Sequence, residues 1–212
     1  MEKTVAVVGG TGAEGSGLAR RFAKSGLRVL IGSRNLDKAQ VTASQIAAQA
    51  RAGEVTGHTN PDATRNAAIV ILTVPLSAQV ETLKSIRGSF APGAILVDTT
   101  VPLEIAIGGR LSRTVTLWDG SAAQQAARLA PADVPVVAAF HSLSAAALAT
   151  LDQLVDCDVL ICGDQVEAKA SVSELAEAIP GVRAIDAGPR RDLAALAGAH
   201  QLHIHGRSFA LE

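Results

Sequence analysis

The sequence predicts an α/β fold: a Rossmann-like, doubly wound and mostly parallel sheet with a short α/β extension at its C-terminal end. Short apolar runs such as "TVAVV" (residues 4–8) lack polar alternation, which is typical of strands buried on both faces of a parallel sheet. These runs alternate with helical segments, which indicates right-handed βαβ units. The first run also leads directly into a glycine-rich turn that opens a helical pattern.

The elements follow in order along the chain. Strands are expected at residues 4–8, 28–32, 67–74, 94–98, 134–140, 157–163 and 182–188. Helices are expected at residues 14–25, 36–50, 77–87, 121–130, 165–179 and 190–203, and residues 101–120 form the longest irregular stretch. We expect a dinucleotide-binding domain over residues 1–140 and a small α/β extension over residues 141–212.

Length and charge limit the possible partners. The 212 residues suit one sizeable core, and a net charge of −1 leaves no electrostatic footprint for nucleic acid. The N-terminal segment lacks the features of a signal peptide, and no window approaches the roughly 18 apolar residues of a membrane span. We therefore expect a cytoplasmic protein without a nucleic-acid or membrane partner.

The two cysteines lie on one predicted strand. Cys157 and Cys162 would be about 16 Å apart and on opposite faces, beyond the reach of a disulfide. Reduced core thiols are expected, and these agree with a cytoplasmic location.

The glycine-rich turn has the spacing G-x-G-x-x-G, directly after a strand and at the start of a helix. In this context the motif predicts dinucleotide binding, with the pyrophosphate at the helix N-terminus. The first glycine allows the tight turn, the second lets the backbone approach the phosphates, and the third lets the helix pack close to the strand. A turn without a ligand is the alternative. The residues are Gly10, Thr11, Gly12, Ala13, Glu14 and Gly15.

The end of the second strand predicts which dinucleotide is bound. An NAD site usually has Asp or Glu there, whereas this chain has Ser33 and Arg34, with Lys38 one helical turn further on. A hydroxyl, a guanidinium and an ammonium are suited to a 2′-phosphate, so NADP is favoured over NAD. A solvated basic helix start remains the alternative.

The third predicted strand ends in Thr73, Val74 and Pro75. These residues would line the carboxyl edge of the sheet, where open α/β folds bind cofactors. A plain strand–helix junction is the other interpretation.

The pattern resembles a known family, the F420-dependent NADP reductases, also called NADPH-dependent reductases of the deazaflavin coenzyme F420. The matching segments span nearly the whole chain: "VVGGTGAEGSGLA", "IGSRNLDKA", "ILTVPL", "VPLE", "FHSLSAAAL", "LDQLVDCDVLICGD" and "IPGVRAIDAGP". The resemblance implies a homodimer that passes a hydride between C4 of the nicotinamide and C5 of the deazaflavin.

The resemblance also implies roles for individual residues. The turn from Thr11 to Glu14 would contact the pyrophosphate, and Ser33, Arg34 and Lys38 the 2′-phosphate. The residues flanking the nicotinamide would be Val74, Pro75, Val101 and Ala139. His141 would border the deazaflavin pocket and donate a hydrogen bond to the acceptor, and residues 141–212 would close that pocket. A structural histidine at the strand end is equally open.

The sequence departs from the family pattern at Ser144, where the family tends to have Pro, and in its last helix. Two other functions therefore remain open. One is an NADPH-dependent reductase of a flavin, a ferric chelate or a small carbonyl or imine compound, and the other is a non-catalytic NADP sensor.

Several residues outside the motifs have less certain roles. Trp118 is expected to be a hydrophobic plug rather than a wall of the ring pocket. Four arginines are expected to be exposed to solvent, and the alternative is that they bind the anionic tail of a deazaflavin. They are Arg110, Arg113, Arg190 and Arg191. No metal site is expected, because no nearby ligands complete a set with His200, His203 and His205, whose role the sequence leaves undecided.

Overall fold

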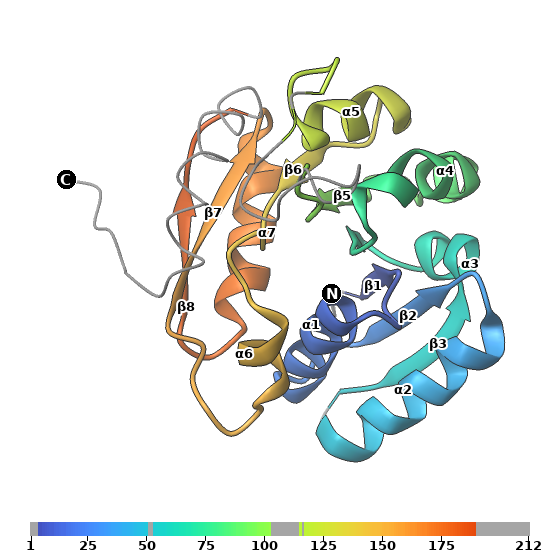
Figure 1. The fold of residues 1–212 in the computed structure, drawn as a ribbon, viewed down its shortest axis with the longest axis vertical. Helices are drawn as coiled ribbons and strands as arrows, with labels where there is room; N and C mark the ends of the chain where they lie inside the picture. The colour runs from blue at the N-terminus through green and yellow to red at the C-terminus, as the bar shows by residue number, and fades with distance from the viewer. Residues whose placement is uncertain (1–3, 51–52, 103–114, 116, 190–212) are drawn as a thin grey trace.

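The computed structural model describes residues 4–50, 53–102, 115 and 117–189, which form one α/β sandwich (Figure 1). Its strands are β1 (Val5–Val8), β2 (Val29–Ser33), β3 (Val55–Thr59), β4 (Ile69–Leu72), β5 (Ile95–Asp98), β6 (Val136–Ala138), β7 (Cys157–Gly163) and β8 (Val182–Asp186). They form an eight-stranded sheet in the order β3-β2-β1-β4-β5-β6-β7-β8. All neighbouring strands are parallel except β6 and β7, so the predicted mostly parallel sheet is confirmed.

Helices cover both faces of the sheet, as a doubly wound fold requires. They are α1 (Ala13–Lys24), α2 (Leu36–Ala50), α3 (Asn60–Arg65), α4 (Leu76–Ile86), α5 (Ala122–Leu129), α6 (Ala145–Ala149) and α7 (Val166–Glu177), with a 3-10 turn η1 (Arg87–Ser89) after α4. One core joins the sheet to α1, α2, α6 and α7, whereas the core on the other face joins it to α3, α4 and α5.

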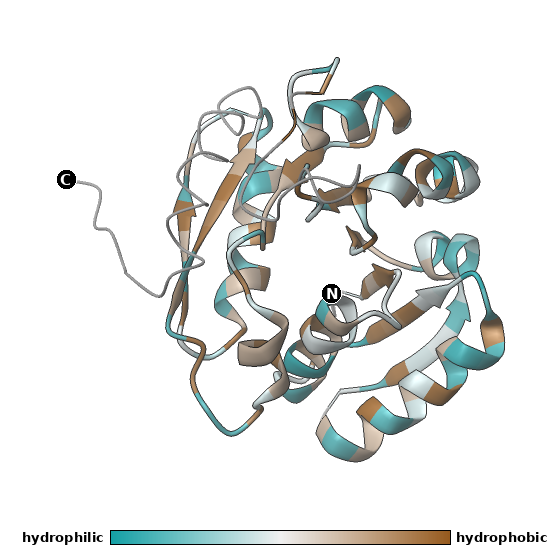
Figure 2. Cartoon of the chain, in the orientation of Figure 1, coloured by the Kyte–Doolittle hydropathy of each residue, from teal (hydrophilic) through white to brown (hydrophobic). Residues whose placement is uncertain are grey.

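The central strands are buried on both faces, which explains their unbroken apolar sequences. In β1, Val5 and Val7 belong to one core and Ala6 and Val8 to the other. The central strands are accordingly drawn mostly in brown, whereas the helices around them mix teal and brown (Figure 2). The strand order changes direction between β1 and β4, and in such folds ligands bind outside the carboxyl ends of the strands at this point.

The described part of the C-terminal region extends the same sheet. Strand β7 runs antiparallel to β6, and β8 pairs in parallel with β7. Helix α7 buries Val172, Leu175 and Ala176 in the core that also contains α1. The division of the chain at residue 140 stays a prediction.

Strand β3 and helices α3 and α6 are not predicted from the sequence. Strand β3, "VTGHT", is a half-buried edge strand without an apolar run. Its Gly57 is needed because a Cβ atom would lie 2.4 Å from the backbone of Ala39 and Gln40 in α2. Helix α6 has only 5 residues, too few to show a helical period.

Cys157 and Cys162 are thiols that form no disulfide in the described structure; Cys157 is partly buried and Cys162 is buried on β7. Among the helices of the described chain, none combines the length and apolar character needed to cross a membrane.

Candidate functional site

The glycine-rich turn lies at the switch point of the sheet, between β1 and α1. Gly9 adopts a left-handed backbone conformation with φ of 79°, and the N–H of Gly10 donates to the carbonyls of Val7 and Gly32, each at 3.1 Å. Gly12 is the N-cap of α1. The first N–H groups of the helix therefore lack intrahelical partners and point out of the sheet edge, as an anion site requires.

The glycines of the motif differ in what surrounds them. A Cβ atom on Gly10 would lie 2.7 Å from the Val7 carbonyl oxygen, and one on Gly15 would lie 2.4 Å from Oγ1 of Thr73. A Cβ on Gly12 would meet only the Gly9 carbonyl oxygen, at 3.5 Å. Gly10 and Gly15 are thus required by the packing of the protein itself, whereas Gly12 borders open space. The contact of Gly12 with a pyrophosphate stays a prediction.

The end of β2 presents the three residues assigned to the 2′-phosphate. Ser33 is buried, and its Oγ accepts a hydrogen bond from the N–H of Asn35 at 3.2 Å. The Asn35 Oδ1 in turn accepts from the N–H of Lys38 at 2.9 Å and so caps the start of α2. The side chains of Arg34 and Lys38 are exposed. The cap fixes the backbone, and both cationic side chains remain accessible to a ligand.

The carboxyl edge of the central strands brings together the residues assigned to the nicotinamide. Strands β4, β5 and β6 are parallel, so Thr73, Val101 and Ala139 follow neighbouring strand ends at one edge. Thr73 donates its hydroxyl to the Val8 carbonyl at 3.0 Å, which joins β4 to β1 just below the glycine turn. Val74 is partly buried, and Pro75 is exposed as the N-cap of α4. Their contacts with a cofactor stay a prediction.

A buried polar network beneath this edge was not predicted from the sequence. The Nε2 of Gln79 donates to Oδ1 of Asp98 at 3.0 Å and to Oγ1 of Thr100 at 2.8 Å, and Gln125 donates to Oε1 of Gln79 at 2.7 Å. Burial raises the pKa of Asp98 to about 6, against the opposing effects of its hydrogen bonds with Gln79 and Thr100. The network joins α4 and α5 to the end of β5 and holds the backbone that leads to Val101. Its only sequence signal was the "DTT" that ends the strand.

Glu14 combines a position in the glycine-rich motif with a perturbed carboxyl group. Burial raises the pKa of Glu14 to about 7, its hydrogen bond with Thr99 opposes this shift, and the nearby Asp98 adds to it. Glu14 is in the first turn of α1, so its carboxylate also faces the end of the helix that attracts anions. The sequence assigns Glu14 to the turn that would contact the pyrophosphate, and that contact stays a prediction.

His141 follows β6 in a tight turn. The residue before it, Phe140, is fully buried with a positive φ of 69°, and its ring packs edge-on against Phe22 of α1 with centroids 6.1 Å apart. The residue after it, Ser142, donates to the Asp158 carbonyl in β7 at 2.9 Å. His141 itself is partly buried. It is thus anchored on both sides at the carboxyl edge of β6, and its predicted role toward an acceptor is untested.

The structure corrects the interpretation of Trp118, which is 99% exposed rather than a hydrophobic plug. The plug prediction assumed that a lone tryptophan would be buried, but Trp118 lies between Leu117 and Gly120, which form an isolated bridge on the surface. Seven further residues discussed above lie outside the described ranges: Arg110, Arg113, Arg190, Arg191, His200, His203 and His205. Within those ranges, no three His, Cys, Asp or Glu side chains gather as a metal site.

Comparison with known proteins gives consistent similarities. Residues 4–102 match the family model described as NADP oxidoreductase, coenzyme F420-dependent. The F420-dependent NADP reductase of Methanothermobacter thermautotrophicus is 47% identical over 191 residues, covering 89% of this chain and 82% of that protein. The enzyme of the same name from Methanocaldococcus jannaschii is 38% identical over 188 residues, covering 87% of this chain and 83% of that protein.

Similarity to solved structures extends over the whole fold. A protein of Arthrobacter sp. FB24, described as a candidate F420-dependent NADP reductase, matches with a TM-score of 0.72 and 21% identity over 96% of this chain and 90% of that one. The NADP-bound pyrroline carboxylate reductase of Plasmodium falciparum matches with a TM-score of 0.60 and 13% identity over 97% of this chain and 66% of that one. At these identities the likeness concerns the fold, which is that of Rossmann-like NADP reductases.

Proposed function

Because the chain belongs to the family of F420-dependent NADP reductases, we propose that it is an oxidoreductase that transfers a hydride between NADP(H) and coenzyme F420. The observation that carries the proposal is the 47% identity to an F420-dependent NADP reductase over 89% of the chain. The glycine turn and the basic end of β2 supply the physical basis for its NADP half.

The dinucleotide would lie across the carboxyl edge of the sheet. The free N–H groups at the start of α1 would bind the pyrophosphate, with Gly12 as the point of close approach. Arg34 and Lys38 would bind the 2′-phosphate from the exposed start of α2, with Ser33 beside them. The nicotinamide would then lie near Val74, Pro75, Val101 and Ala139.

The protein's part in the reaction is positioning. The hydride would pass directly between the nicotinamide and F420, so no protein nucleophile would be required. The chain would hold the two rings in contact and keep water away from them. His141 would donate a hydrogen bond to an acceptor oxygen that gains charge as the hydride arrives.

The test is an assay of the purified protein with NADPH and F420, in which loss of the oxidised deazaflavin absorbance reports turnover. Matched reactions with a flavin, a ferric chelate or a cyclic imine in place of F420 test the alternative acceptors. The ferric chelate is included because rat metalloreductase STEAP3 is 35% identical over 187 residues, which cover 84% of this chain and 33% of that protein. Turnover with F420 well above the other acceptors is expected. Turnover with another acceptor and none with F420 would overturn the proposal.

Three further properties belong to the same proposal. We infer a homodimer, from the family resemblance, and residues 141–212 as an extension that closes the acceptor pocket. We also infer a cytoplasmic location, with which the reduced state of Cys157 and Cys162 agrees. Light scattering at micromolar concentration tests the dimer, and a monomer would contradict it.

A further inference from the structure

Arg21 is a buried cation that the dinucleotide site does not use. It lies on α1, two turns after the glycine motif, and is only 1% exposed. A charged side chain is rarely buried to this extent unless it is paired or fully hydrogen-bonded. Burial lowers the pKa of the guanidinium, and the nearby Asp152 opposes this shift.

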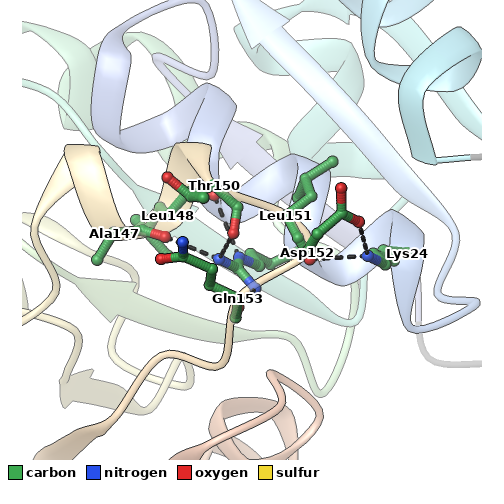
Figure 3. Close-up of polar contacts among 8 residues, drawn as sticks. Lys24, Ala147, Leu148, Thr150, Leu151, Asp152 and Gln153 are labelled. Carbon is green, nitrogen blue, oxygen red and sulfur yellow. Dashed lines mark hydrogen bonds and ion pairs between the residues drawn. The ribbon is translucent and has the colours of Figure 1, made fainter.

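The guanidinium of Arg21 binds the end of α6 and the turn that follows it through four backbone carbonyls. Its Nε donates to Leu148 at 3.1 Å, its Nη1 to Gln153 at 2.8 Å, and its Nη2 to Ala147 at 2.7 Å and to Thr150 at 2.5 Å. Figure 3 shows these four carbonyl-bearing residues converging, with Lys24 beside them bound to Leu151 and Asp152. The last carbonyls of a helix lack intrahelical partners and carry its negative end, so this fork of donors satisfies them.

A glycine one turn earlier allows this close approach. Gly17 lies four residues before Arg21 and therefore shares its face of α1. A Cβ atom on Gly17 would lie 2.7 Å from Cβ of Leu148, which is fully buried. The backbone of α1 at Gly17 is thus in direct contact with the Leu148 side chain of α6. Any side chain larger than that of glycine at position 17 would force the two helices apart.

The segment that contains His141 is held by α1 on both sides. Before His141, Phe140 packs against Phe22, the neighbour of Arg21. After it, Ser144 caps α6 by accepting from the N–H of Ala147 at 3.1 Å, and the far end of α6 is bound by Arg21. The glycine turn and the His141 segment are therefore attached to one rigid helix.

We propose that Arg21 is a positioning residue for hydride transfer, which fixes the segment 139–144, and His141 with it, relative to the dinucleotide turn at the other end of α1. This inference rests on the proposed function, since it assigns the pyrophosphate of the dinucleotide to the glycine turn and the nicotinamide and acceptor rings to the segment that contains Ala139 and His141. A shift of about 1 Å between the reacting rings is enough to slow such a reaction strongly.

The test compares Arg21→Lys with wild type. Lysine keeps the charge but lacks the planar fork that reaches four carbonyls. The expected result is an NADPH Kd within twofold of wild type, a kcat with F420 at least about tenfold lower, and a larger deuterium isotope effect from NADPH labelled at the transferred hydrogen. Arg28→Lys is the matched control, because Arg28 forms an exposed ion pair with Glu54 and should behave as wild type.

Amide hydrogen exchange provides a readout that does not depend on F420. In Arg21→Lys, residues 139–149 should exchange at least about tenfold faster than in wild type, whereas residues 13–20 should be unchanged. Exchange at the wild-type rate over residues 139–149 would overturn the inference. So would faster exchange with unchanged kcat and isotope effect, because Arg21 would then serve stability alone.

The role of Arg21 can be tested even if the protein does not reduce F420 or if Arg21→Lys does not fold. If wild type reduces no F420, the proposed function fails, and hydrogen exchange still decides whether Arg21 holds the segment. If Arg21→Lys does not fold, Gly17→Ala displaces α6 while it keeps the guanidinium, and the same kinetic pattern is expected. Gly17→Ala with wild-type exchange, kcat and isotope effect would then overturn the inference.

Discussion

Helix α1 has a glycine and a nearby cation in two different settings: at its start both are open to solvent, and further along both are covered by the protein. At its start, Gly12 borders open space and the cations Arg34 and Lys38 nearby are exposed. Further along the helix, Leu148 packs directly against Gly17, and the cation Arg21 is buried among backbone carbonyls. The first end is left open for a ligand, whereas the second is completed by the protein itself. The surroundings of a glycine or an arginine therefore decide whether it serves ligand binding or the packing of the protein, and the residue type alone does not.

The largest effect on NADPH binding is expected from filling the open space at Gly12. Gly12→Val places a branched side chain in open space that the pyrophosphate would occupy, so NADPH affinity should fall by more than about 100-fold while the fold is retained. Calorimetry with NADPH and thermal unfolding measure the two properties.

Gly15→Ala is the matched control for Gly12→Val. Its Cβ would lie 2.4 Å from Oγ1 of Thr73, so overpacking should reduce the free energy of unfolding by about 1–3 kcal/mol. Normal NADPH binding by a folded Gly12→Val variant would contradict the open-end interpretation.

The next effect tests the exposed cations. Arg34→Ala should weaken NADPH binding by about 1.5–3 kcal/mol, the range for a hydrogen bond to a charged group, and should hardly change NADH binding. Titration calorimetry with both dinucleotides measures the difference. Equal losses of binding free energy for NADPH and NADH would contradict the assignment of Arg34 to the 2′-phosphate.

A smaller effect is expected at the acceptor side. His141→Ala removes one donor from a delocalised acceptor, so turnover with F420 should fall by about 10²-fold at most, while NADPH affinity stays within about twofold. Steady-state kinetics with F420 and NADPH titration separate the two quantities. Unchanged turnover would make His141 a structural residue of the turn that follows β6.

The same contrast explains what the sequence revealed and what it did not. The glycine turn and the basic end of β2 are local motifs, because their residues act together within a few positions of the chain. The bonds of Arg21 reach carbonyls 126 to 132 residues away, and a carbonyl leaves no mark in the sequence because every residue has one. The Asp98–Gln79 pair also spans two elements, 19 residues apart. Edge strand β3 and the short α6 lack the periodicity that predicts secondary structure.

The smallest expected effect is a pH dependence that arises from Glu14. Its pKa is about 7 in the folded protein and near 4.5 in the unfolded chain, so below pH 4.5 both forms are protonated and the group has no effect on stability. As the pH rises from 4.5 to 7, only the unfolded state loses the proton, and stability falls. Above pH 7 the penalty is complete. The shift corresponds to at most about 3 kcal/mol, and partial access to water reduces it to about 1 kcal/mol.

Glu14→Gln removes this titration and keeps the size of the side chain. Urea unfolding at pH 4.5 and at pH 8 should therefore give equal stabilities for the two proteins at the lower pH and a more stable variant, by about 1 kcal/mol, at the higher pH. Asp98, with a pKa of about 6, titrates in both proteins, so the difference between them reports Glu14 together with its interaction with Asp98. A difference that does not change between the two pH values would mean that Glu14 is not held in a desolvated position at the start of α1.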